Sequence, residues 1–264
     1  MTGHGRLGRE WGVVVALGAR AIRTTLRKAQ LLVPTFVLPL MLLAIISSGT
    51  SAATSLQGFP DVRSFVAFIL PGTILQGTLL AGVTGGIAMA TDIELGFFDR
   101  LAAAPVARMS IVLGRLCGTL ALAVAQSTLF ITVAALFGAR FEGGFTGGAV
   151  AVLLAAVAGM ATGGFGAALA LGFGKISLVQ SFFPFMFILL FTTPAFFPKE
   201  LLAPALRGAS TWNPLTYIVQ GIRAALIDPG AVSDQVLGLA AGLALAVVMV
   251  SSCSLALRIR MRAT

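Results

Sequence analysis

Six long apolar stretches constrain this chain more than any other feature. Each is long enough to cross the hydrocarbon core of a bilayer, roughly 30 Å thick, which takes about 20 apolar residues per helix. None alternates as a membrane β-strand does, so the stretches predict helices. Charged residues are only 10% of the sequence, too few for a soluble surface of this size. The expected spans are Leu31–Ser47, Phe65–Ala90, Ile111–Phe137, Ala149–Phe173, Ile176–Phe197 and Val236–Leu257.

The sequence therefore predicts an all-α, polytopic membrane protein with six transmembrane helices. The six form one domain at residues 31–257. A cytoplasmic N-terminal segment, residues 1–30, precedes this domain, and a basic cytoplasmic tail, residues 258–264, follows it.

All nine carboxylates lie outside the six stretches. A carrier driven by protons or sodium ions usually places an Asp or Glu at bilayer depth to bind and release the cation. Their absence there favours an energy source outside the bilayer region. The nine acidic residues are Glu10, Asp61, Asp92, Glu94, Asp99, Glu142, Glu200, Asp228 and Asp234.

The positive charges predict the orientation. Thirteen of the 18 Lys and Arg residues fall in segments that share a side with the N-terminus, and five fall on the other side. Because cations concentrate on the cytoplasmic side of short connections, both termini are expected in the cytoplasm. The net charge of +9 then indicates topology and contact with the anionic lipid bilayer, with no nucleic acid as partner.

Residues 1–30 predict an amphipathic helix in the headgroup plane. The segment does not resemble a secretory signal, because four cations follow its apolar run where the cleavage site would be expected. The helix is either an anchor that fixes topology or a lever joined to a partner below the membrane. In a helical projection one side carries Arg9, Arg20, Arg23 and Arg27, and the opposite side carries Leu7, Trp11, Val14, Ala21 and Ile22.

The sequence offers no catalytic residues and no metal site. No His, Cys and carboxylate cluster has ligand spacing, and no nucleophile has a base nearby. Gly174-Lys175 resembles part of a phosphate loop, but Leu169 stands where a Gly is needed and Ile176 where a Ser or Thr is needed. The chain is therefore expected not to be an enzyme and to carry no ATP site of its own.

The connection at about residues 92–108, between the second and third spans, is the most specific local signal. A short amphipathic helix that stops before Pro105 is expected here. Its apolar side would need a partner, either lipid headgroups or a soluble protein. The residues that carry this prediction are Glu94, Phe97, Phe98, Asp99, Arg100 and Leu101.

This connection resembles the signature of the ABC-2 type permeases, the membrane subunits of type V ABC exporters. The resemblance lies in Glu94-Leu-Gly-Phe-Phe-Asp-Arg-Leu-Ala-Ala-Ala-Pro-Val-Ala-Arg108, in Ile111-Val-Leu-Gly-Arg115 and in Asn213-Pro-Leu-Thr-Tyr217 with Arg223. Span number, length and motif order agree with it over nearly the whole chain. Within the family, the sequence is most similar to the daunorubicin-exporter and antibiotic-resistance branch.

The resemblance implies a division of labour between subunits. Glu94–Ala104 would be a coupling helix seated in a groove of a separate nucleotide-binding subunit, and Leu7–Lys28 would be the connecting helix beside it. Two ATPase subunits, which hold ATP and Mg, would serve two permease chains, identical or related. The cargo would be an amphipathic drug, antibiotic or lipid moved out of the cytoplasm or inner leaflet of a bacterial cytoplasmic membrane. Lipid-linked glycan export is an alternative within the family.

The connection at about residues 198–234 is too apolar for an ordinary loop and predicts short helices that dip into the outer leaflet, as the resembled family also has. It would gate the exit side or act as a structural cap. Its candidate gate residues are Trp212, Asn213, Tyr217 and Arg223.

Polar side chains at membrane depth either line a substrate path or tie helices together. The candidates for the path are Thr73, Gln76, Gln126 and Thr128. Arg115, four residues inside its span, is expected to snorkel to the interface. Glycine pairs spaced four apart, such as Gly82 and Gly86, predict close helix packing. The fifth stretch, with Pro184 and Pro194, is expected to be the most interrupted.

Three function classes follow. An ABC exporter permease agrees with the most features. A cation-coupled carrier lacks the buried carboxylate, and an intramembrane enzyme or assembly scaffold lacks a catalytic constellation.

Overall fold

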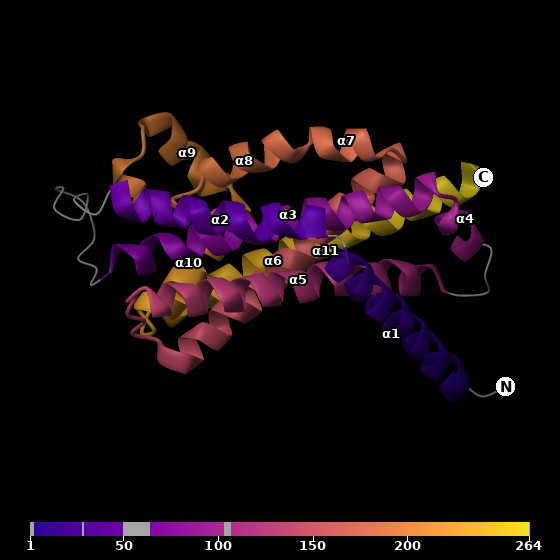
Figure 1. Ribbon diagram of the computed structural model, residues 1–264, viewed down its shortest axis with the longest axis horizontal. Coiled ribbons are helices and arrows are strands. Elements are labelled where there is room, and N and C mark those ends of the chain that lie inside the picture. The colour runs from indigo at the N-terminus through magenta and orange to yellow at the C-terminus, as the bar shows by residue number, and fades with distance from the viewer. Residues whose placement is uncertain (1–2, 28, 50–63, 103–106, 264) are drawn as a thin grey trace.

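The computed structural model describes the backbone of residues 3–27, 29–49, 64–102 and 107–263. Side chains are described within these ranges except at 3–9, 25–26, 29–31, 49, 99, 102, 108 and 263. All the regular secondary structure of the described residues is helical, as expected (Figure 1). The helices are α1 (Gly3–Arg27), α2 (Ala29–Gly49), α3 (Phe65–Glu94), α4 (Phe97–Ala102), α5 (Arg108–Leu136), α6 (Gly144–Phe173), α7 (Ile176–Ser181), α8 (Phe183–Phe191), α9 (Pro204–Trp212), α10 (Pro214–Ile227) and α11 (Val232–Ala263).

Four of these helices are long and apolar enough to cross a membrane within the described residues: α3, α5, α6 and α11. The first and fifth apolar stretches of the sequence form shorter helices instead. Leu32–Ser48 lies within α2, and Ile176–Phe191 is divided between α7 and α8. The break at Phe182 comes just before Pro184 in the first turn of α8, so the expected interruption of the fifth stretch is confirmed.

Helix α3 is the centre of the bundle. It packs against α2, α5, α6 and α10, while α11 covers the side of α6 and α10 away from α3. Its residues are apolar around the whole circumference, which is typical of a helix buried on all sides. Ile69, Leu70 and Leu75 are fully buried. Pro71 lies inside α3, and the helix continues through it.

Glycine allows α3 and α6 to approach closely. A Cβ atom at Gly82 would lie 2.6 Å from Thr162 Cβ, and one at Gly166 would lie 2.3 Å from the Gly82 carbonyl oxygen. Real Cβ atoms do not approach backbone this closely, so these positions require glycine. The Thr162 hydroxyl donates to the Thr78 carbonyl across the same interface (2.8 Å). The close packing expected from glycine spacing is thus confirmed for Gly82 and Gly86.

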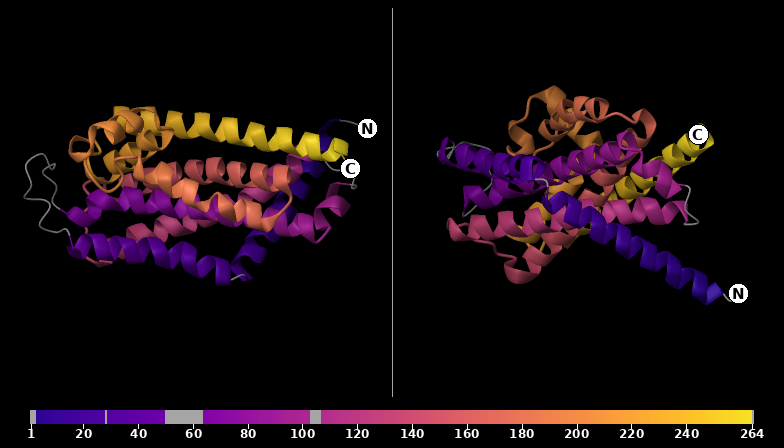
Figure 2. Two further views of the ribbon diagram at one scale, coloured as in Figure 1. Left: turned by 90° about the horizontal axis from the view of Figure 1, so that it is seen from above. Right: turned by 45° about the vertical axis from the view of Figure 1, so that its right-hand side comes forward.

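The two ends of the bundle differ. The N- and C-termini and α4 lie at one end, and α9 lies at the other (Figures 1 and 2). Helix α1 packs chiefly against α5 and extends obliquely away from the bundle. We call the end that carries α4 the coupling end and the other the distal end.

Replacing Gly166 by Ala should destabilise the bundle by about 1–3 kcal/mol, because the new methyl group meets a backbone carbonyl that cannot yield. Gly172→Ala on the same helix is the matched control, since nothing lies within 4 Å of a Cβ atom there. Unfolding in detergent can be followed by the reaction of the buried Cys253 thiol with a fluorogenic maleimide. Equal unfolding temperatures for the two variants would contradict the proposed contact.

Candidate functional site

The turn from α3 into α4 sets the geometry of the coupling end. Helix α3 continues through Asp92 to Glu94, so both acids lie in its last turn and not in a loop. Gly96, with φ +67°, then reverses the chain in a left-handed conformation that suits glycine. The short helix expected over Glu94–Ala104 is present in part, as Phe97–Ala102, because Glu94 belongs to α3, and Pro105 lies outside the described residues.

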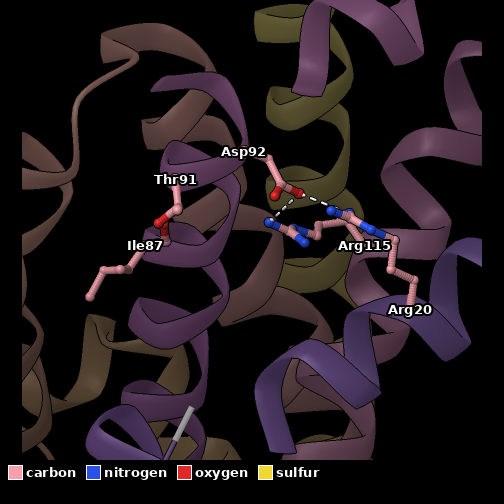
Figure 3. Close-up of polar contacts among 5 residues, drawn as sticks. All are labelled: Arg20, Ile87, Thr91, Asp92 and Arg115. Atoms are coloured by element: carbon pink, nitrogen blue, oxygen red, sulfur yellow. Dashed lines mark hydrogen bonds and ion pairs between the residues drawn. The ribbon is translucent and has the colours of Figure 1, made fainter. Parts of the chain in front are cut away.

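Asp92 is the electrostatic centre of this end. Its Oδ2 atom lies 3.2 Å from Arg20 Nη1 on α1 and 3.1 Å from Arg115 Nη2 on α5 (Figure 3). The side chains of Asp92 and Arg115 are only 16% and 10% exposed, so water screens this pair weakly. One carboxylate oxygen therefore joins three helices.

Arg115 corrects an expectation. Its side chain was expected to snorkel to the interface, but it stays buried and turns toward Asp92, because the last turn of α3 brings a carboxylate within reach. Snorkelling would leave Asp92 to the more exposed Arg20 alone.

Arg20 also contacts α4. The guanidinium carbon of Arg20 lies 3.7 Å from the centroid of the Phe97 ring, within the range of a cation–π contact. Arg20 thus binds the last turn of α3 and the first residue of α4 at once. A displacement of α4 would therefore also displace α1, because the Arg20 side chain contacts both helices.

Helix α1 is held against α5 by small residues and by a carboxylate cap. A Cβ atom at Gly114 would lie 2.5 Å from Leu17 Cβ, and one at Gly118 would lie 3.0 Å from Ala21 Cβ. At the start of α5, Glu10 accepts hydrogen bonds from the Ala107 N–H (3.2 Å) and the Ser110 hydroxyl. The acid supplies the cap that Ala107 cannot, at the positive end of the helix dipole.

The predicted connecting-helix residues differ in exposure. Trp11 is 67% exposed, and Arg23 and Arg27 are exposed as well. Arg20 alone among them turns inward, to Asp92 and Phe97.

The predicted coupling residues also divide between the inside and the outside of the chain. Phe98 is 2% exposed and packs in the core with Met89, Ile111 and Leu257. This corrects the expectation that Phe98 contacts a partner, because the chain itself fills that apolar site. Phe97 and Leu101 are partly buried, Arg100 is exposed, and the side chain of Asp99 lies outside the described part.

Two further side chains complete this surface. Glu94 accepts a hydrogen bond from the Ile176 N–H at the start of α7 (2.8 Å), so its carboxylate joins two elements of the same chain. Leu95, which follows it, is 70% exposed.

The polar residues at membrane depth do not form one continuous path. Gln126 donates from Nε2 to the Thr35 carbonyl of α2 (2.9 Å), the acceptor that Pro39 leaves without an intrahelical donor. Gln126 therefore ties helices. Thr73 and Gln76 are fully buried on α3, and no described residue bonds the Thr73 hydroxyl or the Gln76 amide. Thr128 is exposed and lines a separate groove between α5 and α6.

The chain matches the model of the family described as ABC-2 type transporter over residues 13–227. It belongs to the ABC-2 type transporter family. A protein named a transport permease, ycf38, from Porphyra purpurea is 26% identical over 214 residues, 80% of this chain and 72% of the relative. Its counterpart from Pyropia yezoensis is 26% identical over 217 residues, with the same coverage. The daunorubicin resistance ABC transporter permease protein DrrB1 of Streptomyces coeruleorubidus is 31% identical over 96 residues, 36% of this chain and 34% of the relative.

Membership of the ABC-2 family makes the chain a membrane transport component, since its apolar helices and its relatives agree on a permease. In this ABC-2 permease three of the four predicted residues of the distal end, Asn213, Tyr217 and Arg223, make contacts within the chain. Asn213 accepts from the Leu215 N–H (3.0 Å) to cap α10, and its amide donates to the Leu189 carbonyl (2.8 Å) at the end of α8. Tyr217 donates to the Thr211 carbonyl (3.0 Å), and Trp212 is 90% exposed.

Arg223 joins three parts of the distal end of the permease. Its Nη2 atom donates to the Pro194 and Ala195 carbonyls (2.8 and 3.0 Å) in the non-helical segment after α8. Its Nε atom donates to the Phe68 carbonyl of α3 (3.3 Å), and the guanidinium lies 4.1 Å from the centroid of the Phe68 ring. The carbonyl groups of the non-helical segment after α8 thus find a donor on α10.

Sequence reasoning missed Asp92, Glu10 and the inward role of Arg115. A signal exists for Glu10, the one acid of the basic N-terminal segment, because the first turn of α5 offers no capping side chain of its own. No comparable signal pairs Asp92 with Arg20, since 72 positions separate them.

Asp92→Asn should destabilise the ABC-2 permease far more than Arg20→Gln. The first change leaves the buried Arg115 without a counter-ion, a loss of roughly 3–5 kcal/mol for a buried pair. The second removes a side chain that is 40% exposed and leaves Asp92 paired with Arg115, a loss of about 0–1 kcal/mol. Maleimide labelling of Cys253 on heating measures both. A larger loss from Arg20→Gln would contradict the assigned order.

Proposed function

We propose that this chain is the membrane-spanning permease subunit of an ATP-driven exporter whose separate ATPase subunit binds at the coupling end. One observation carries the proposal. The exposed part of the α3–α4 turn, with Leu95 and Arg100, continues into Asp92, Phe97 and Phe98, which contact residues of α1, α5, α6 and α11. A push on this surface is therefore delivered to the bundle.

The charge distribution supports a cytoplasmic location for this end. Exposed cations gather on it, and cations favour the cytoplasmic side of short connections. Both termini lie at the same end, so both would be cytoplasmic, in a bacterial cytoplasmic membrane. The exposed cations are Arg23, Arg27, Arg100, Lys175, Arg258 and Arg262.

Six crossings remain our proposal for the topology. Helix α2 and the pair α7–α8 run alongside the four long helices and are apolar, although each is short (Figures 1 and 2). Their exposed Val37, Met41, Phe185 and Ile188 suit lipid or a second permease chain. A dimer of permeases with two ATPase subunits, which hold ATP and Mg, would form the transporter.

The cargo we propose is an amphipathic drug, antibiotic or lipid. The partial likeness to a daunorubicin resistance permease supports this class. A route past buried amide and hydroxyl groups such as Gln76 and Thr73 suits a bulky neutral or amphipathic molecule better than a bare ion, which needs charged groups or rings of carbonyls. Helices α9 and α10, held by Asn213 and Arg223, would gate the exit.

Ion coupling is the weaker alternative. Asp92, with a side chain only 16% exposed, already neutralises two arginines. Its carboxylate is therefore already paired and does not offer a site for a transported cation, whereas transport driven by external ATPase subunits requires no such acid.

Docking is tested by surface changes that spare the core. Leu95→Asp and Arg100→Glu should each reduce co-purification of the co-expressed ATPase subunit at least about tenfold, because a docked apolar or charged contact contributes about 1–2 kcal/mol or more. The measurement is the ATPase subunit recovered per permease from detergent-solubilised membranes.

Matched controls lie at the distal end. Leu136, 81% exposed, is replaced by Asp, and the exposed Arg140 by Glu. These variants should capture the ATPase subunit normally. If the coupling-end variants capture as much ATPase as these two, docking at α4 is refuted.

A further inference from the structure

Arg260, which sequence reasoning placed in a basic tail, lies within the last turn of α11 and reaches across to α6. Its Nη1 atom donates to the Leu171 carbonyl (3.2 Å), one of the carbonyl groups that the end of α6 leaves without an intrahelical donor. Gly174 ends α6 in a left-handed conformation with φ +67°, and a Cβ atom there would lie 2.9 Å from Arg260 Nη1. The guanidinium thus occupies the negative end of the α6 dipole.

The same guanidinium faces the coupling helix. Its central carbon lies 5.9 Å from the centroid of the Phe98 ring, at the outer limit of a cation–π contact. Phe98 is 2% exposed, so this contact is shielded from water. Leu171 and Leu257, one from each of the two helices that Arg260 joins, belong to the same apolar cluster as Phe98.

The two neighbouring phenyl rings of α4 therefore meet two arginines from opposite ends of the chain. Arg20 of α1 covers Phe97, and Arg260 of α11 lies over Phe98. Successive residues of a helix point about 100° apart, so the rings face different sides. Phe97 is linked through Arg20 to the group α1, α3 and α5, whereas Phe98, which also packs among residues of α3 and α5, reaches the group α6 and α11 through Arg260.

We propose that Arg260 is a positioning residue of the permease that transmits movement of α4 to the α6–α11 pair, as Arg20 transmits it to α1. The proposal rests on the proposed function, because it assumes that an ATPase subunit moves α4. A rigid connection on one side alone would let α4 tilt about Phe97. Connections on both sides force the two helix groups to move together.

Arg260→Gln tests the proposal in the co-expressed permease–ATPase complex. The variant should still capture the ATPase subunit, since Arg260 contacts the buried Phe98, whereas the proposed docking residues Leu95 and Arg100 are exposed. The amount of daunorubicin, used as the probe, that is moved into inside-out vesicles per ATP hydrolysed should fall about tenfold. That ratio corresponds to about 1.4 kcal/mol, the size of a shielded cation–π contact.

The controls separate this role from loss of charge. Arg258→Gln and Arg262→Gln remove the same charge from exposed positions on the same helix and should keep the wild-type ratio. Arg260→Lys, which keeps a cation within reach of the ring and of the Leu171 carbonyl, should restore most of it.

A second variant covers the case in which Arg260→Gln fails to fold. Phe98→Leu keeps an apolar side chain in the cluster and removes the ring, so it should show the same loss of coupling with only a small fall in unfolding temperature. The double variant should be no worse than either single one, because both remove one contact.

The outcomes are distinguishable. A wild-type ratio in Arg260→Gln or in Phe98→Leu, or losses that add in the double variant, would overturn the role of Arg260 while the exporter stands. A wild-type permease that captures no ATPase subunit or moves cargo without ATP would overturn the proposed function itself.

Discussion

In a bundle this apolar, a buried polar group is stabilised by a partner within the chain, and several such pairs join its helices. Leaving a buried donor or acceptor unpaired costs about 1–3 kcal/mol, and leaving a buried charge unpaired costs more. Gln126 donates to the Thr35 carbonyl, which Pro39 leaves without an intrahelical donor, and Arg223 donates to carbonyl groups of the segment after α8. Asp92 neutralises Arg115. These contacts are spread along the bundle, and each joins elements that are distant in the sequence.

The glycine contacts between α3 and α6 make this part of the bundle rigid. Where Gly82 and Gly166 bring α3 and α6 into backbone contact, the helices cannot slide without a clash. Movement must then occur by displacement of helix groups as units. At Gly96, between α3 and α4, a Cβ atom would meet nothing within 4 Å, so no close backbone contact fixes the turn itself.

Much of the fold can be predicted from periodicity and composition, because long apolar runs and charge-rich connections are local properties of the sequence. The short helix after Gly96 and the break before Pro184 follow from local chemistry as well. What could not be predicted are pairings across the bundle. Phe98 and Phe97 are alike in the sequence, yet only Phe98 is buried, because residues of α3, α5, α6 and α11 surround that side of α4. A single sequence contains no information on which helix lies there.

The division between the inner and outer residues of α4 bears on how force enters the molecule. An apolar ring docked in a partner's groove would slip if its own helix were free. Phe98 is instead fixed in the permease core, and Phe97 is fixed beneath Arg20, which leaves Leu95 and Arg100 exposed for the partner that we propose. A cation–π contact of about 0.5–2 kcal/mol is weak alone. Two such contacts, together with the burial of Phe98 and the ion pairs of Asp92, hold a helix of six residues that has no independent stability. Helix α4 is therefore firm because the bundle holds it, and under the proposed function a movement imposed on its outer side would be passed on to the bundle.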